Sequence, residues 1–327
     1  MRYSDFSLKK WILAVVFAPA VFFSLVTASC GFVVDDGAPE PPPLRVSFLD
    51  VGQGLAVLVE NGGRYAMYDT GPDSAGVMDS LVARGVDTLE WVVVSHNHRD
   101  HAGGFMELAG RGPSKTARVA VKRLYVGPDT AGGFVRDSVL RVARRFGIPV
   151  DTLVRGDALG LFSGAGDALR FDVLWPPDYV REGGNPASVV MRVEFGAASL
   201  LLTGDLDSAG ERRLLELSPT LGAGLLQVGH HGSAGSSTLR FLSQVAPDYA
   251  VISVGAGNGY GHPREEVLRK LGLVLGDTAR LYRTDLQGSV GFELWPDLGV
   301  VRPWRAVVAC FLVQMGCGHR CGSDWCF

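Results

Sequence analysis

The placement of histidine is the feature that most constrains this chain. Six of the seven histidines in 327 residues fall within three short segments. Each segment follows an apolar run of the kind that forms a buried β-strand. These histidines are His96, His98, His101, His230, His231 and His262. A fold that brings the three strand ends to one edge would assemble a cluster of imidazoles, which are common ligands of divalent metals.

The densest of these segments directly follows the apolar run 91–95. It reads HNHRDHAGG and offers four potential metal ligands, His96, His98, Asp100 and His101. Two imidazoles separated by one residue can converge on one ion. The turn into the next helix would aim Asp100 and His101 at a second ion nearby. This spacing predicts a two-metal site, and solvent-facing histidines gathered by chance are the simpler alternative.

Two aspartates are predicted to complete the site. Asp205 ends the segment SLLLTGD, where a carboxylate can bridge two cations and offset their charge. Asp69 lies in the segment YDTG and could orient a ligand imidazole through a hydrogen bond. Taken singly, either aspartate could be an ordinary turn residue. The neighbouring histidine cluster favours a functional interpretation of both.

From residue 44 onward, strand-like runs alternate with helical stretches. Apolar residues make up 47% of the chain and charged residues 20%, which supports a buried core. So many strands with interspersed helices favour two packed sheets covered by helices, an α/β four-layer αββα sandwich, over one doubly wound sheet. The predicted strands span 45–49, 55–60, 64–68, 91–95, 123–126, 170–174, 189–195, 199–203, 225–228, 249–254, 281–284 and 290–294. The predicted helices span about 74–84, 103–109, 135–146, 206–217, 236–245 and 263–271.

The motif HxHxDH, with Asp69 before it and Asp205 after it, resembles the metallo-β-lactamase fold superfamily. A finer set of motifs is similar to the nuclease-like domain of ComEC-type DNA-uptake competence proteins, over about residues 44–294. These motifs are FLDVGQG, YDTG, SHNHRDHAGG, LLTGD, VGHHGSAGSS, VISVG, YGHP and YRTDLQG. The resemblance implies the αββα sandwich of this superfamily and hydrolysis by a hydroxide that two metal ions activate.

Carried over residue by residue, the resemblance implies two ligand sets that share Asp205 as a bridge. One ion would be held by His96, His98, Asp205 and His231, and the other by Asp100, His101, Asp205 and His262. Superfamily members usually have a further ligand histidine between HxHxDH and the bridging carboxylate, and none occurs here. The resemblance therefore implies that His231 fills this vacancy. A ligand set of nitrogen and oxygen suits Zn²⁺ or Mn²⁺.

The predicted catalytic residues are His230 and Asp69. His230 would bind phosphate or protonate the leaving oxygen. The reverse order of the pair, with His230 on metal and His231 on phosphate, stays open.

The function that these features favour is that of an exported, metal-dependent phosphodiester hydrolase, a DNase related to DNA uptake or scavenging. The alternatives are a metallo-hydrolase of a cell-wall phosphodiester, a lactone or a thioester, and a non-catalytic DNA-binding module. The net charge of −3 argues against a strongly cationic nucleic-acid binder. Local charge must therefore hold an anionic substrate, and no nucleotide cofactor is expected.

A basic stretch between residues 115 and 145 is one candidate for that local charge. Its predicted helix carries arginines that could follow a DNA backbone. The simpler alternative is that they form the solvated side of an amphipathic helix, opposite a buried stripe. The basic residues are Lys115, Arg118, Lys122, Arg123, Arg136, Arg141, Arg144 and Arg145, and the predicted stripe is Val135, Val139, Val142, Ala143 and Phe146.

The first 29 residues have the layout of an export signal or membrane anchor. Basic residues precede an apolar run from Trp11 to Leu25, and small residues then lead to Cys30. Lipid attachment at Cys30, a cleaved secretory signal and an uncleaved anchor are the alternatives. All three place the rest of the chain outside the cytoplasm, as a secreted, periplasmic or membrane-anchored protein.

The remaining domain organisation follows from composition. A Pro-rich linker over 30–43 would lead to a hydrolase domain over 44–297. The tail over 298–327 contains four cysteines and one histidine. Disulfides are the expected use of these cysteines in an exported chain, and a structural metal is the alternative.

Overall fold

The computed structural model describes residues 42–110, 119–129, 133–160, 169–177, 183–218, 220–297 and 299–304. The predicted export segment, Cys30 and the cysteines of the tail lie outside the described residues. None of the described helices combines the length and the apolar character needed to cross a bilayer.

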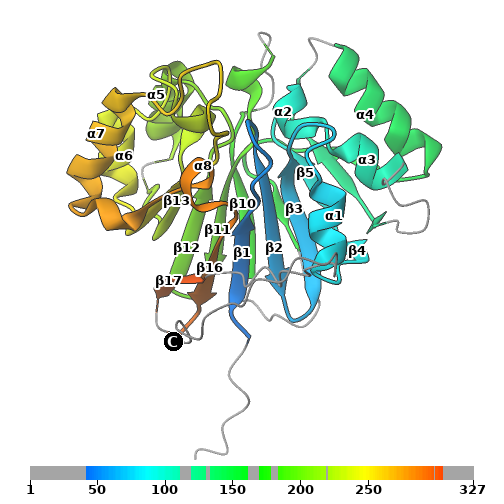
Figure 1. The fold of residues 1–327 in the computed structure, drawn as a ribbon, viewed down its shortest axis with the longest axis horizontal. Coiled ribbons are helices and arrows are strands. Elements are labelled where there is room, and N and C mark those ends of the chain that lie inside the picture. The colour runs from blue at the N-terminus through cyan, green and yellow to red at the C-terminus, as the bar shows by residue number, and fades with distance from the viewer. Residues whose placement is uncertain are drawn as a thin grey trace, which may run out of the picture. The chain divides into compact units, whose positions relative to one another are not determined.

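Two large sheets face each other at the centre of the fold (Figure 1). The first has the order β17-β16-β1-β2-β3-β5-β7-β8 and the second the order β15-β14-β13-β12-β11-β10-β9. In the first sheet the strands are β1 (Leu44–Phe48), β2 (Ala56–Asn61), β3 (Arg64–Thr70), β5 (Val92–Val94), β7 (Leu124–Val126), β8 (Val150–Thr152), β16 (Val290–Trp295) and β17 (Val300–Trp304). In the second they are β9 (Ala158–Leu159), β10 (Leu169–Trp175), β11 (Val190–Phe195), β12 (Ala198–Leu202), β13 (Leu225–Gln227), β14 (Tyr249–Ile252) and β15 (Leu281–Arg283). A separate parallel pair joins β4 (Thr88–Leu89) to β6 (Ala120–Val121).

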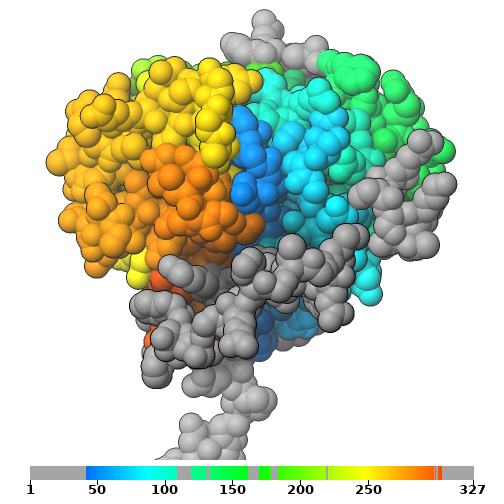
Figure 2. All heavy atoms as spheres, viewed as in Figure 1, coloured from blue at the N-terminus to red at the C-terminus, as the bar shows by residue number. Residues whose placement is uncertain are grey.

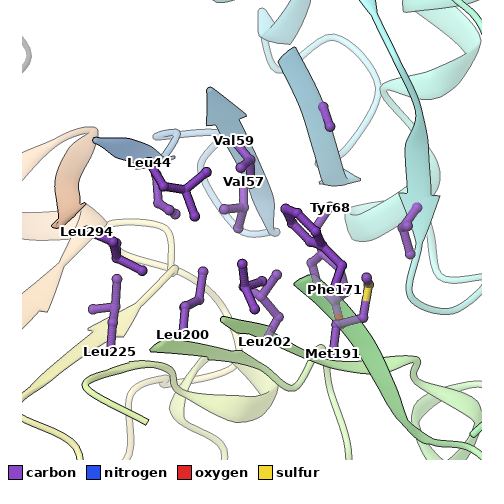
Figure 3. Close-up of a cluster of buried hydrophobic side chains, with 14 of the residues drawn as sticks. Leu44, Val57, Val59, Tyr68, Phe171, Met191, Leu200, Leu202, Leu225 and Leu294 are labelled. Carbon is purple, nitrogen blue, oxygen red and sulfur yellow. The ribbon is translucent and has the colours of Figure 1, made fainter. Parts of the chain in front are cut away.

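Both faces of each large sheet are buried. Alternate residues of a strand point to opposite faces, so neighbouring residues belong to different parts of the core. On β2, Val57 and Val59 belong to the core between the sheets, whereas Leu58 packs on the other side with the helices. Leu200 and Leu201 divide in the same way on β12. Figure 3 shows the side chains of the central core meeting between the sheets.

Helices cover the outer face of both sheets. The first sheet packs against α1 (Val77–Ala83), α3 (Phe105–Gly110) and α4 (Phe134–Arg145), with the short α2 (Arg99–Ala102) beside them. The second packs against α5 (Ser208–Leu217), α6 (Leu239–Val245) and α7 (Glu265–Leu275). The turn-length helices are η2 (Asn185–Ala187), η3 (Gly229–Gly232), η4 (Thr278–Arg280) and α8 (Thr284–Gln287). The predicted four-layer αββα sandwich is confirmed.

The loop between β1 and β2 contacts segments that follow strands of both large sheets. In Figure 2 it is the blue segment between the yellow and cyan surfaces. Leu55 donates its backbone N–H to the Asp100 carbonyl (3.0 Å), and Ser253 donates its hydroxyl to the Gly54 carbonyl (2.8 Å). A Cβ at residue 54 would lie 2.5 Å from the Asp100 oxygen, so only glycine fits this close approach.

Every predicted strand and helix has a counterpart in the structure. The sequence did not predict the two- and three-residue strands β4, β6, β8 and β9, nor the longer β17. Of these, β17 pairs with β16 along the sheet edge and lies beyond residue 297, where the predicted domain ends. Its Pro303 is compatible with strand structure because an edge strand has one unpaired side.

A candidate metal centre at the strand ends

The predicted site residues meet where parallel strands end. β5 leads into the segment that carries His96, His98, Asp100 and His101, and β12 leads into Asp205. β13 leads into η3, which holds His230 and His231, and His262 follows β14. Strands β12, β13 and β14 run parallel, as do β3, β5 and β7, so their carboxyl ends face the same edge.

Four of these side chains form a buried group that we call the inner cluster: His96, His101, Asp205 and His231. Each is at most 3% exposed. The Asp205 oxygen Oδ1 lies 3.2 Å from His101 Nε2. The other oxygen, Oδ2, lies 3.6 Å from His231 Nε2 and 4.0 Å from His96 Nε2. Asp205 therefore faces three imidazoles, and its bridging of two ions stays a prediction.

The potential ligand atoms form two groups that share His101. One comprises His96, His101 and Asp205, and the other comprises Asp100, His101 and His231. His231 Nε2 is 3.4 Å from Asp100 Oδ2. This differs from the grouping that the resemblance implied, in which His231 joins His96 and His98. The reason is a hydrogen bond that His231 Nδ1 donates to the Ser253 carbonyl (2.8 Å), which turns the opposite ring nitrogen toward Asp100.

The inner cluster fits a divalent metal. Among the described residues, the buried atoms His96 Nε2 and Asp205 Oδ1 make no well-aligned hydrogen bond, although His101 Nε2 lies 3.2 Å from the oxygen. Leaving buried polar atoms unsatisfied costs about 1–3 kcal/mol each. A cation bound between these atoms would remove that cost. The donors are all nitrogen and oxygen, a set compatible with Zn²⁺ or Mn²⁺.

The other histidines in the described part of the chain form an outer group: His98, His230 and His262. His98 is exposed, and its ring centroid is 4.5 Å from that of His96. His230 Nε2 lies 3.8 Å from Asp205 Oδ2, and the His230 and His262 ring centroids are 5.9 Å apart. The structure brings His98 and His262 to the site but not into either ligand group among the described residues.

Asp69 supports the inner cluster from behind. It is completely buried, and its carboxylate accepts hydrogen bonds from His101 Nδ1 (2.7 Å), the Ser95 amide (2.6 Å) and the Ser95 hydroxyl (2.7 Å). Its φ of 58° is unusual for a residue with a side chain. A buried carboxylate in contact with the far nitrogen of His101 does not meet a substrate. The geometry makes Asp69 a positioning residue rather than a catalytic one.

The sequence reasoning missed several buried polar residues that hold the loops in place. Ser95 Oγ lies 3.1 Å from His96 Nδ1. Gln227 accepts hydrogen bonds from the Thr203 and Gly204 amides (2.7 and 2.8 Å) and so shapes the loop before Asp205. The available signal was a single polar residue at the end of an apolar strand, as in WVVVS and LLQV.

Burial and close contact shift the pKa values of the residues in the inner cluster. Burial alone would raise the pKa of Asp205, but His101 and His231 outweigh it and hold that pKa well below its usual range. Burial alone would lower the pKa of His101, yet Asp205 and Asp69 raise it well above the ordinary value. Burial and the nearby His101 lower the pKa of His96 strongly. The lowered pKa of His96 favours the neutral form, in which an imidazole binds metal, whereas His101 would have to release a proton to bind one.

The inner cluster opens into a cavity of about 410 Å³, with Asp205 and His231 in its lining. Beside it lies a second cavity of about 510 Å³. The two share four lining residues, Asn97, His98, Asn185 and His230. The Asn185 side-chain nitrogen lies 3.2 Å from His230 Nε2. His230 and Asn185 therefore stand at the junction, where a ligand could extend to both sides.

The basic stretch is only partly available to a ligand. Lys122 pairs with Glu90 (2.8 Å), and Arg123 pairs with Asp151. Arg141, Arg144 and Arg145 are exposed on α4, whereas Arg136 is half-buried, and Lys115 and Arg118 lie outside the described residues. The predicted buried stripe holds at Val139 and Ala143, but Phe146 is 37% exposed, with the Arg145 guanidinium 5.6 Å from the centre of its ring.

Comparison with known proteins identifies similar sequences and a similar fold. A family model described as the metallo-beta-lactamase superfamily matches residues 49–256. Competence protein ComA of Neisseria gonorrhoeae is 35% identical over 263 residues, which cover 78% of this chain and 33% of that protein. ComE operon protein 3 of Bacillus subtilis is 31% identical over 270 residues, with 76% and 33% covered. The chain thus spans about a third of the length of these relatives.

A solved structure supports the fold assignment. The crystal structure of CmlA, a diiron beta-hydroxylase from Streptomyces venezuelae, aligns with a TM-score of 0.50. The alignment covers 82% of this chain and 55% of that chain at 13% identity. At this identity the likeness concerns the fold alone.

Proposed function

The chain belongs to the metallo-β-lactamase superfamily, a family of metallo-hydrolases, and from this premise we propose that it is an exported, metal-dependent phosphodiesterase that cleaves DNA during uptake or scavenging. One observation carries the proposal. Asp205 lies among three buried imidazoles and has an oxygen without a well-aligned hydrogen bond within the described residues, while His230 stands next to it at the mouth of the cavity.

The fold of this superfamily binds divalent metals, and the inner cluster with Asp100 would hold them here. His96, His101 and Asp205 would hold one ion, and Asp100, His101 and His231 offer the ligands for a second. Asp205 also lies 3.6 Å from His231 Nε2, which is why we propose that it takes part in binding both. Bound there, divalent cations would polarise a phosphoryl oxygen and acidify a water molecule. Their positive charge would also attract an anionic diester to a chain whose net charge is −3.

The chain's own residues orient the diester and move a proton. His230 is 28% exposed and lines both cavities, so a phosphate at the junction lies within reach of its ring. Burial lowers the pKa of His230, so the ring is neutral at rest. It would take up a proton from the attacking water and then donate one to the leaving oxygen. Asn185 positions that ring, and Asp69 keeps His101 turned toward Asp205.

The substrate and the location form the finer part of the proposal. Identity of 35% to a competence protein supports DNA as the diester. The apolar segment over residues 11–25, preceded by basic residues, supports export.

A hydrolysis assay tests this function. The full chain is stripped of metal, reloaded with Zn²⁺ or Mn²⁺, and given linear single-stranded DNA, bis(p-nitrophenyl) phosphate, a lactone and a thioester. We expect hydrolysis of both phosphodiesters, lost on chelation and in Asp205→Ala. Cleavage of the lactone or thioester alone would favour another hydrolase, and DNA binding without turnover would favour a non-catalytic module.

A further inference from the structure

Tyr260 is an exposed aromatic residue on the wall of the metal-centre cavity. Its side chain lines the same 410 Å³ cavity as Asp205 and His231. The residue is 65% exposed, whereas Tyr68 is fully buried. One isolated exposed aromatic needs no explanation, but one at the mouth of a candidate active site is a place for a ligand to bind.

The Tyr260 ring is held in a defined orientation. It lies nearly parallel to the His262 ring, at an interplanar angle of 17° and a centroid distance of 5.9 Å. The backbone around it is fixed by Asn258, whose side-chain oxygen accepts from the Tyr260 and His262 amides (3.2 and 3.1 Å). The Asn258 side-chain nitrogen donates to the His262 carbonyl (2.7 Å). One face of the ring is therefore occupied by His262, and the large exposed fraction leaves the rest of the ring available.

The surroundings favour a flat ligand attached to a phosphate. The His262 ring contacts both the Tyr260 ring and the ring of His230, the residue that we place at the phosphate. Gln53 and Arg99 line the same cavity, where Gln53 adds an amide, while the Arg99 guanidinium is paired with Asp73. In a nucleic acid each phosphate has bases on both sides, and unpaired bases stack on protein aromatic rings whatever their sequence.

We propose that Tyr260 is the platform on which an unpaired nucleobase stacks beside the scissile phosphate, so that it sets a preference for single-stranded nucleic acid over small diesters. This inference rests on the proposed phosphodiesterase function. A paired base is already stacked within its duplex and cannot offer its face to Tyr260. The site therefore selects strands with splayed bases.

A binding comparison tests the role of Tyr260. Short thymidine oligonucleotides and abasic strands of equal length, both with hydrolysis-resistant phosphorothioate linkages, are titrated onto the Mn²⁺-loaded full chain. Fluorescence anisotropy gives Kd for each strand. Stacking of one base is expected to give the wild-type chain about a 10-fold tighter Kd for thymidine strands than for abasic strands. Tyr260→Ala and Tyr260→Leu should bind both strands equally, whereas Tyr260→Phe and Tyr260→Trp should keep the preference.

Leu273→Ala is the matched control, because Leu273 is 74% exposed on α7 and lies outside the lining of this cavity. It should keep the preference. A base preference that persists in both Tyr260→Ala and Tyr260→Leu would overturn the inference, as would a wild-type chain without any preference. Loss of abasic binding in both variants would make Tyr260 a structural support and overturn it too. Failure of the wild-type chain to hydrolyse bis(p-nitrophenyl) phosphate would instead refute the phosphodiesterase function and leave the binding result standing.

Discussion

The inner cluster and the outer group both contain three histidines, and two of the loops contribute to each, yet the protein supports these imidazoles differently. Each inner imidazole has a buried partner at its second nitrogen. The Ser95 hydroxyl lies at His96, Asp69 accepts from His101, and the Ser253 carbonyl accepts from His231. In the outer group His98 is exposed, and His262 has an unpartnered buried Nδ1 within the described residues. Fixed rings suit metal binding, and less constrained rings can adjust to a substrate.

The two adjacent histidines of η3 separate these roles most sharply. Both have positive φ, 51° for His230 and 54° for His231. Consecutive left-handed residues are strained, and such strain tends to occur at functional sites. Here the backbone sends one ring into the inner cluster, at 3% side-chain exposure, and leaves the other 28% exposed at the cavity.

Replacing His230 should have the largest effect on catalysis of any change that leaves the metal bound. In His230→Ala we expect turnover of bis(p-nitrophenyl) phosphate to fall roughly 10²–10⁴-fold, because a positioned proton donor is lost. Its bound metal should stay at the wild-type level. His231→Ala should lose metal, since His231 lies in a ligand group. The opposite metal contents in the two variants would show that the roles are reversed.

The loop after the histidine pair is held in place by a buried carboxyl group, Glu211. Glu211 accepts hydrogen bonds from the amides of Ser237 and Thr238. Burial raises the pKa of Glu211 from 4.5 to about 7, although those amides and Lys270 act in the opposite direction. The folded chain therefore binds this proton more tightly than the unfolded chain. The free energy of unfolding should fall as the pH rises from about 4.5 to about 7.

Urea unfolding of the wild-type chain and Glu211→Gln over this pH range measures the effect. The side chain of the variant does not titrate, so the wild-type chain should lose about 3 kcal/mol of stability relative to it between pH 4.5 and 8. Histidine titrations common to both chains cancel in the difference. A difference in unfolding free energy that stays constant with pH would show that Glu211 is ionised throughout.

The support of the inner cluster can be tested at Asp69. In Asp69→Asn we expect affinity for Zn²⁺ to weaken about 10–100-fold, because the amide holds His101 less firmly than the carboxylate does. Competition with a chromogenic chelator gives the affinity. Asp79→Asn, at an exposed position on α1, is the matched control and should bind as the wild type does. Equal Zn²⁺ affinity in Asp69→Asn and Asp79→Asn would show that the contact between Asp69 and His101 does not contribute to metal binding.

The sequence was most informative where its pattern is periodic or dense. Apolar runs such as AVLVEN predicted the strands of the sandwich, and the HNHRDHAGG segment predicted two residues of the inner cluster. Short strands such as β9 are too brief to show a period. The grouping of His231 with Asp100 depends on a hydrogen bond to Ser253, 22 residues away, and on backbone angles that no local pattern encodes. The contribution of Ser95 likewise appears only once β3 and β5 lie side by side.

Metal content of Asp205→Ala is the most direct test of the account, because Asp205 is the residue through which the inner cluster would hold two ions. The full chain, loaded with Zn²⁺ and freed of excess metal, is analysed by atomic emission alongside the variant. We expect close to two equivalents in the wild-type chain and loss of both together in Asp205→Ala. Retention of one full equivalent by the variant would contradict the bridging role of Asp205.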